Sequence, residues 1–101
     1  MTEFIKAAHC SDISEGGGVV ATVRGKSIAI FRIDGKFFAM GNICPHRGGP
    51  LGDGELNGFT VTCPWHAWEF DVRSGCNSEN KKVVVPTFET RIDGDLLMVK
   101  V

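Results

Sequence analysis

The chain has 101 residues, a formal net charge of −1 and 43% hydrophobic residues. This length is that of one domain, so we expect residues 1–101 to fold as a single domain around one modest core. The longest cationic run is Lys81-Lys82, which argues against nucleic acid as a partner. No apolar run approaches the roughly 18–20 residues of a membrane helix and no signal peptide is evident, so we expect a cytoplasmic protein without a membrane partner.

Short β-prone runs, separated by turn signals, follow one another along the chain. The turn signals are Arg24-Gly25, Asp34-Gly35, Asn57-Gly58 and Asp93-Gly94. Asp-Gly and Asn-Gly pairs favour type I′ hairpin turns, whose central residues need positive φ. The predicted strands are Val19–Val23, Ser27–Ile33, Lys36–Met40, Phe59–Thr62, Trp68–Val72, Val83–Val85, Phe88–Ile92 and Leu96–Val101. Because no convincing amphipathic helix of three turns accompanies them, the pattern predicts an all-β sandwich or barrel.

One stretch, residues 41–54, interrupts this pattern. It contains five glycines and two prolines, so we expect a loop. The loop carries Cys44 and His46 in the phrase Cys-Pro-His, and a similar phrase, Cys-Pro-Trp-His, follows later with Cys63 and His66. A predicted hairpin joins the two phrases. The two Cys/His pairs are therefore expected to meet at one tip of the molecule.

Two thiols and two imidazoles on adjacent loops suit either zinc or an iron–sulfur cluster. Zinc fingers usually place two cysteines on one knuckle and two histidines on another element, whereas here each loop supplies one of each. If Cys44 and Cys63 hold one iron and the histidines the other, each loop clamps both metals. This is the His₂Cys₂ ligation of a Rieske [2Fe–2S] centre. A lone cysteine or histidine is more often a packing residue, but two such pairs, each with a proline after its cysteine, are hard to explain as core.

The segment CPHRGGPLGDGELNGFTVTCPWHAWEFDVRSG resembles the cluster-binding segment of Rieske-type ferredoxins. The likeness rests on both ligand motifs, their spacing, Pro64-Trp65, Phe70-Asp71 and Ser74-Gly75. It implies a Rieske-like antiparallel β-sandwich with a cluster-binding subdomain at about residues 41–72, made of two loops on a hairpin. It also implies one [2Fe–2S] cluster per chain. The implied ligands are Cys44 and Cys63 for the inner iron, and the Nδ1 atoms of His46 and His66 for an outer iron near the surface.

The resemblance also bears on the reduction potential. High-potential relatives carry an extra cysteine in each ligand loop, joined as a disulfide, and the matching positions here are Gly49 and Trp65. Those relatives also direct a serine and a tyrosine hydroxyl at the cluster, where this chain has Trp68 and Phe70. Hydrogen bonds to sulfur stabilise the reduced state, so their absence predicts the low end of a range of roughly −150 to +300 mV. Ala67 departs from the family pattern, which commonly has glycine after the second histidine.

The apolar residues around the motifs and the two remaining cysteines support less specific predictions. We expect an apolar rim around the histidines, formed by Pro50, Leu51, Trp65 and Trp68. Core packing is the alternative for both tryptophans. For Trp65 the rim and the core are equally expected, and for Trp68 the core is preferred. Cys10 and Cys76 are interpreted as ordinary thiols, with a Cys10–Cys76 disulfide as the alternative.

By resemblance, the protein is an electron carrier and not itself an enzyme. It would take electrons from an NAD(P)H-dependent flavin reductase and pass them to a terminal oxygenase, typically an aromatic-ring hydroxylating dioxygenase. Docking would be transient and centred on His46 and His66. One alternative is the small Rieske-like subunit of an NADH-dependent nitrite reductase. Many such subunits lack the ligands that this chain retains, which favours the carrier. The other alternative is a zinc-stabilised interaction module.

Overall fold

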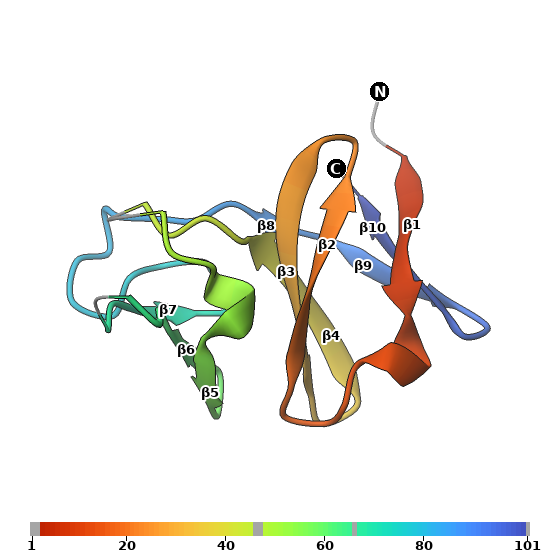
Figure 1. The fold of residues 1–101 in the computed structure, drawn as a ribbon, viewed down its shortest axis with the longest axis horizontal. Helices are drawn as coiled ribbons and strands as arrows, with labels where there is room; N and C mark the ends of the chain where they lie inside the picture. The colour runs from red at the N-terminus through yellow and green to blue at the C-terminus, as the bar shows by residue number, and fades with distance from the viewer. Residues whose placement is uncertain (1–2, 46–47, 66, 101) are drawn as a thin grey trace.

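The computed structural model describes residues 3–45, 48–65 and 67–100, and within them ten strands form three antiparallel sheets (Figure 1). The first sheet has the order β1-β10-β9, the second β2-β3-β4-β8 and the third β5-β6-β7. The first sheet consists of β1 (Phe4–His9), β10 (Leu96–Lys100) and β9 (Thr90–Asp93). The second consists of β2 (Gly18–Val23), β3 (Lys26–Ile33), β4 (Lys36–Gly41) and β8 (Thr87–Phe88). The third consists of β5 (Glu55–Asn57), β6 (Thr60–Thr62) and β7 (Glu69–Asp71). The predicted all-β antiparallel fold is confirmed.

Two short 3₁₀ turns complete the described structure, η1 (Cys10–Asp12) and η2 (Leu51–Asp53). A search of the described residues for a helix long and apolar enough to cross a membrane finds none.

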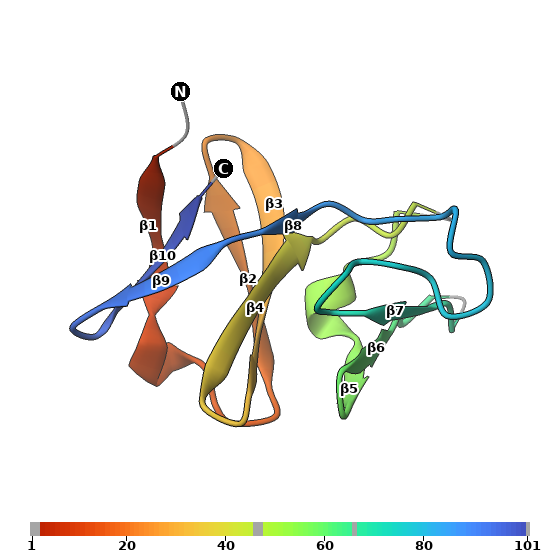
Figure 2. The same ribbon diagram turned by 180° about the vertical axis from the view of Figure 1, so that it is seen from behind.

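The central sheet is buried on both faces, which makes it the middle of three layers (Figure 2). Along β3, Ile28 and Ile30 pack toward the β1-β10 side with Leu97 and Val99. Residues Ala29, Phe31 and Ile33 of the same strand pack toward the β5-β6-β7 side. Successive side chains of a strand point to opposite faces, so one strand contributes to two cores.

Two of the four predicted hairpin turns have the expected geometry. Arg24-Gly25 and Asp34-Gly35 both have positive φ at each central residue, as a type I′ turn requires. At the other two turns the strand pairing extends through Asn57 and Asp93. The central pairs there begin with Gly58 and Gly94, and only the glycine has positive φ. Glycine in the first central position is typical of a type II′ turn, so type I′ was the wrong prediction for these two.

The predicted strands differ from the structure in three further ways. The sequence analysis missed β1 and β5, which are paired through β10 and β6. Val83–Val85 is not a strand, although Val84 forms an isolated bridge with Cys76. The predicted strand Phe88–Ile92 is divided at Glu89, because β8 pairs with β4 and β9 pairs with β10. The chain thus passes from the central sheet to the outer sheet within one residue.

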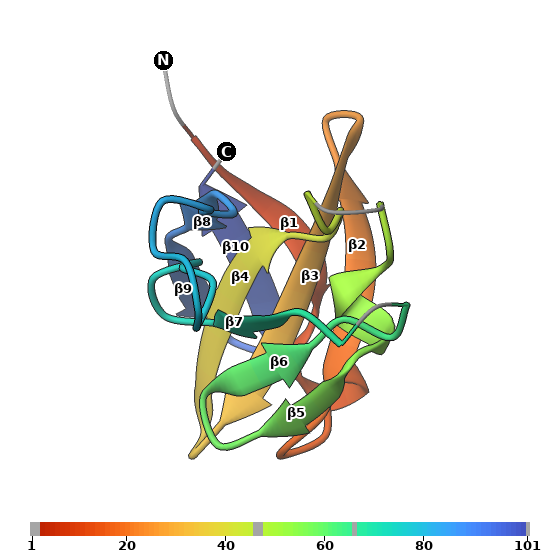
Figure 3. The same cartoon turned by 90° about the vertical axis from the view of Figure 1, so that its left-hand side faces the viewer.

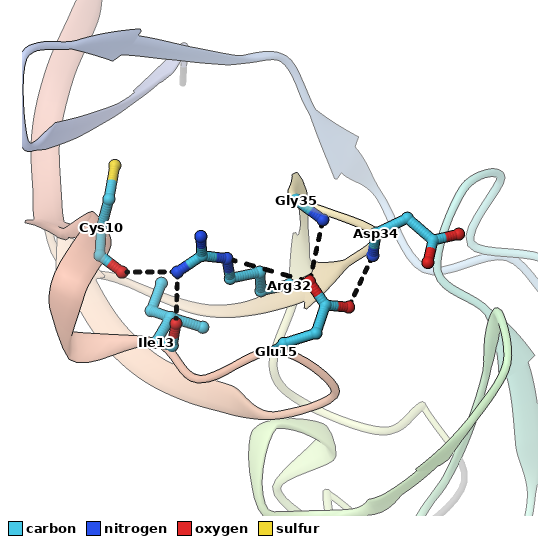
Figure 4. A network of polar contacts seen from close by, with 6 residues as sticks. All are labelled: Cys10, Ile13, Glu15, Arg32, Asp34 and Gly35. Atoms are coloured by element: carbon cyan, nitrogen blue, oxygen red, sulfur yellow. Dashed lines mark hydrogen bonds and ion pairs between the residues drawn. The ribbon is translucent and has the colours of Figure 1, made fainter.

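A polar network ties the β3–β4 turn to the segment that follows η1 (Figure 4). The carboxylate of Glu15 accepts hydrogen bonds from the backbone N–H groups of Asp34, at 2.6 Å, and Gly35, at 2.8 Å. These bonds, that of Gly35 first, lower the pKa of Glu15. The guanidinium of Arg32 donates to the carbonyl oxygen of Ile13 at 3.1 Å. The network fixes the hairpin by bonding to its backbone.

Candidate metal centre

Two loops of six residues carry the Cys/His pairs, and they share one backbone hydrogen-bond pattern. The first ligand loop is residues 44–49 and the second is residues 63–68. In each, the N–H of the cysteine donates to the carbonyl oxygen of the sixth residue, at 2.9 Å from Cys44 to Gly49 and at 2.7 Å from Cys63 to Trp68. The N–H of the fifth residue donates back to the carbonyl oxygen of the cysteine, at 2.7 Å in the first loop and 3.1 Å in the second. The repeated Cys-Pro phrase is thus accompanied by the same two closing hydrogen bonds in both loops.

The fifth residue of each loop has a left-handed backbone. Gly48 has φ of 76° and Ala67 has φ of 59°. A residue with a Cβ atom is disfavoured in this region by roughly 1–2 kcal/mol, and glycine is not. The departure at Ala67 therefore falls at a position where the backbone favours glycine.

The two cysteines lie inside the molecule and not on its surface. Cys44 is 1% exposed and Cys63 is 2% exposed, and both belong to the core shared with Leu51, Val61 and Phe70. Cys63 directly follows β6, and Cys44 follows the end of β4 by three residues. His46 and His66 lie outside the described residues. The described part of the site is therefore a pair of buried thiols.

Gly49 brings the two loops into contact. A Cβ atom at this position would lie only 2.7 Å from Sγ of Cys63 and 3.1 Å from Cγ of Trp65. The backbone of the first loop therefore packs directly on the sulfur of the second, and both loops lie on the same side of the β5-β6-β7 sheet (Figure 3). Because Gly49 has no side chain, the space beside the buried sulfur of Cys63 stays open. This arrangement is compatible with two thiolates that bind one metal group. Gly49 and Trp65, the positions matched to the disulfide of high-potential relatives, are indeed neighbours.

The two tryptophans have different environments. Trp65 is 58% exposed, so core packing is wrong for it, whereas Trp68 is half-buried against the core. Leu51 is fully buried, so it contributes no exposed surface to the predicted apolar rim around the histidines. Ile43, just before the first loop, is 56% exposed. The described residues of both loops carry no charge, and Arg47 of the first loop lies outside the described residues.

The sequence did not predict two buried asparagines, and the structure decides between the two alternatives for Cys10 and Cys76. Asn42 and Asn77 are the two buried polar residues among those described, at 5% and 7% exposure. An asparagine in a loop-like stretch is usually a turn residue in contact with solvent, so the sequence carries no signal of their burial. Cys10 and Cys76 are both free thiols, and the alternative of a disulfide between them is wrong.

Comparison with known proteins gives a consistent result. The Rieske [2Fe–2S] domain family matches residues 3–89. The ferredoxin component of the naphthalene 1,2-dioxygenase/salicylate 5-hydroxylase systems of Ralstonia sp. is 35% identical over 100 residues, which cover 96% of this chain and 94% of that protein.

Solved structures show the same fold. A chain in the complex of reduced oxygenase and oxidised ferredoxin in carbazole 1,9a-dioxygenase matches with a TM-score of 0.86 and 26% identity, covering 95% of this chain and 91% of that one. A Mycobacterium tuberculosis protein described as the small subunit of an NADH-dependent nitrite reductase matches with a TM-score of 0.91 and 23% identity, covering 100% and 96%. The family match spans most of the chain, the relative from Ralstonia nearly all of it, and the buried thiols suit the family's cofactor. The chain therefore belongs to the Rieske [2Fe–2S] domain family.

Proposed function

We propose that this protein is an electron carrier of the cytoplasm that moves single electrons from an NAD(P)H-dependent flavin reductase to a terminal oxygenase. The observation that carries the proposal is the pair of buried thiols, Cys44 and Cys63, on two loops in direct contact at Gly49. The support from relatives is the ferredoxin component of an oxygenase system, which matches over nearly the full length of both chains. Such a component transfers electrons and leaves the chemistry on the substrate to the oxygenase.

The proposed ligands are Cys44 and Cys63 for one iron and His46 and His66 for the other. A [2Fe–2S] group so held supplies a one-electron couple whose oxidised form is formally neutral, which raises its potential above that of a four-cysteine cluster. The chain keeps water from both sulfurs by burying them in the core. Phe70 is fully buried and has no hydroxyl to donate to sulfur, which supports a potential at the low end of the Rieske range. These loops and the β5-β6-β7 hairpins form the subdomain that we place at about residues 41–72.

Partner docking is proposed at the tip that carries His46 and His66. The exposed Trp65 and Ile43 lie against Gly49 and Gly48, consecutive residues of the first loop. The described part of the tip thus contributes two exposed apolar side chains next to the ligand loops. Transient redox complexes bury less than about 1,200 Å² in total, so a surface of this small size is sufficient.

A second candidate is a small subunit of an NADH-dependent nitrite reductase, because the fold of such a protein is shared over the whole chain. The two functions differ in how the partner is held. A carrier dissociates from its partner between electron transfers, whereas a subunit stays in a stable complex. Size-exclusion chromatography of the protein with each candidate partner distinguishes them, and a stable complex with a large reductase subunit would favour the second function.

His66→Cys tests the ligand assignment. We expect this variant either to retain the cluster poorly or to have a lower reduction potential, because a thiolate adds negative charge. The measurements are iron and acid-labile sulfide per chain, the EPR spectrum of the reduced protein and a redox titration. An unchanged spectrum and potential would show that His66 is not a ligand, and zinc without sulfide would establish the interaction module instead.

A further inference from the structure

We propose that Asn42 and Asn77 are positioning residues, one for each ligand loop, and that they hold the loops in place independently of the bound cluster. They are the two buried polar residues in the described part of the chain. Burying a polar side chain is unfavourable unless its hydrogen bonds are made, so such a residue is stable only where its partners are fixed. Their association with the metal site rests on the proposed function, whereas their contacts with the loops are structural.

Asn42 joins the base of the first ligand loop to two other elements. Its side-chain oxygen accepts from the N–H of Gly52 in η2 at 2.7 Å, and its amide nitrogen donates to the hydroxyl of Ser27 in β3 at 3.1 Å. Its backbone bonds to the same two regions, since its N–H donates to the carbonyl oxygen of Ser27 and its carbonyl oxygen accepts from Leu51. The chain enters the loop at Cys44, two residues after Asn42, and leaves it just before η2. Both ends of the first loop are therefore held through one side chain.

Asn77 has the corresponding role at the second loop. The chain after β7 turns back along that strand (Figure 2), and the amide nitrogen of Asn77 donates to the carbonyl oxygen of Glu69 at 3.2 Å. Glu69 is the residue that directly follows the second loop. The side-chain oxygen of Asn77 accepts from the N–H groups of Glu79, at 3.0 Å, and Asn80, at 2.8 Å. One side chain thus closes a tight turn and bonds that turn to the exit of the second loop.

The arrangement has a consequence for electron transfer. Both histidines belong to short loops whose ends are bonded to the body of the protein, so loop movement during a change of redox state is restricted by the chain itself. Preorganised ligands are favoured by supporting contacts of this kind, and a loop without them is displaced more easily. Loss of either asparagine should therefore affect its own loop and not the other.

The test compares Asn42→Ala with Asn77→Ala in the protein as purified. Hydrogen exchange of the peptides that contain residues 44–49 and 63–68 is followed by mass spectrometry, with Asn57→Ala, at an exposed turn, as the control. Loss of buried hydrogen bonds is expected to accelerate exchange by about tenfold or more. We expect Asn42→Ala to accelerate only the first loop and Asn77→Ala only the second. Equal acceleration of both loops, or of neither, overturns the proposal.

Aspartate variants keep the test decisive if an alanine variant fails to fold. Asn42→Asp retains an acceptor for Gly52, and the hydroxyl of Ser27 can turn to donate, so the first loop should exchange within about threefold of the wild type. Asn77→Asp retains both acceptor bonds of the turn but cannot donate to Glu69 when ionised, so the second loop should still exchange faster. The opposite pattern for the two aspartates refutes the assigned contacts.

A spectroscopic readout separates positioning from general stability. In Asn42→Ala and Asn77→Ala we expect altered g-values in the EPR spectrum of the reduced protein and faster loss of iron, and Asn57→Ala should change neither. Unchanged g-values in both variants would show that the two asparagines stabilise the fold without positioning the ligand loops, and this result would overturn the proposal. If the purified protein holds no iron, the proposed function fails, while the exchange experiment still reports whether the two loops are positioned as inferred.

Discussion

Gly49→Ala is the sharpest perturbation of the contact between the ligand loops. The new methyl carbon would lie 2.7 Å from Sγ of Cys63, whereas ordinary contacts begin near 3.4 Å. The sulfur or the loop backbone would have to move by about 0.7 Å, which exceeds the roughly 0.5 Å within which a metal or catalytic site must be held. We therefore expect the variant to bind substantially less iron.

The same overlap should lower the stability of the fold. Overpacking of a well-packed core costs about 1–3 kcal/mol. For a domain of this size each kcal/mol lowers the thermal midpoint by roughly 4–8 °C. The measurements are iron and acid-labile sulfide per chain, and thermal unfolding followed by circular dichroism.

Gly48→Ala is the matched control, because it adds the same methyl group to the neighbouring residue. Among the described residues, the nearest atom to its new carbon would be Cγ2 of Ile43, at 4.0 Å, so we expect its cost to come from the left-handed backbone. Ala67 already occupies the equivalent position of the second loop. We expect Gly48→Ala to be less stable but to keep its iron. If Gly49→Ala instead binds iron as the wild type does, with an unchanged midpoint, the packing of Gly49 on Cys63 is refuted.

Two further predictions concern backbone strain and acid stability. Ala67→Gly should stabilise the fold by about 1 kcal/mol, seen as a higher thermal midpoint, because glycine adopts the left-handed backbone without strain; a lower midpoint would contradict this. The pKa of Glu15 is lowered from 4.5 by the N–H groups of Gly35 and Asp34. Its carboxylate therefore stabilises the fold above the pKa of the unfolded chain, and this contribution is lost as the pH falls through the folded pKa. In urea denaturation, Glu15→Gln should thus have a lower free energy of unfolding than the wild type at neutral pH, and the same free energy of unfolding in acid. The same difference between the two proteins at both pH values would refute the role of the charge.

Local signals in the sequence were sufficient for features that depend on a few neighbouring residues. Arg24-Gly25 and Asp34-Gly35 form their predicted turns because positive φ is a property of the turn itself. The two Cys-Pro phrases likewise predicted that their cysteines lie in one region of the molecule, and both cysteines are buried in the same core.

Features that depend on distant partners could not be read from the sequence. Nothing in the run Phe88–Ile92 indicates that its two halves belong to different sheets, because that division is decided by β4 and β10. The burial of Asn42 depends on Ser27 and Gly52, which lie on two other elements. The sequence also contained no indication that Gly48 and Ala67 have the same left-handed backbone, because the two residues are of different types.

The closing hydrogen bonds and the left-handed fifth residue that the two ligand loops share make each loop an internal reference for the other. Counted from the cysteine, histidine is the third residue of the first loop and the fourth residue of the second. The order of residues therefore differs between two loops that share these hydrogen bonds. Two loops closed by the same hydrogen bonds thus carry histidine at different sequence positions, and a substitution in one loop can be compared with the residue that already occupies the same position in the other. Matched substitutions in residues 44–49 and 63–68 would therefore compare two histidine positions within one protein.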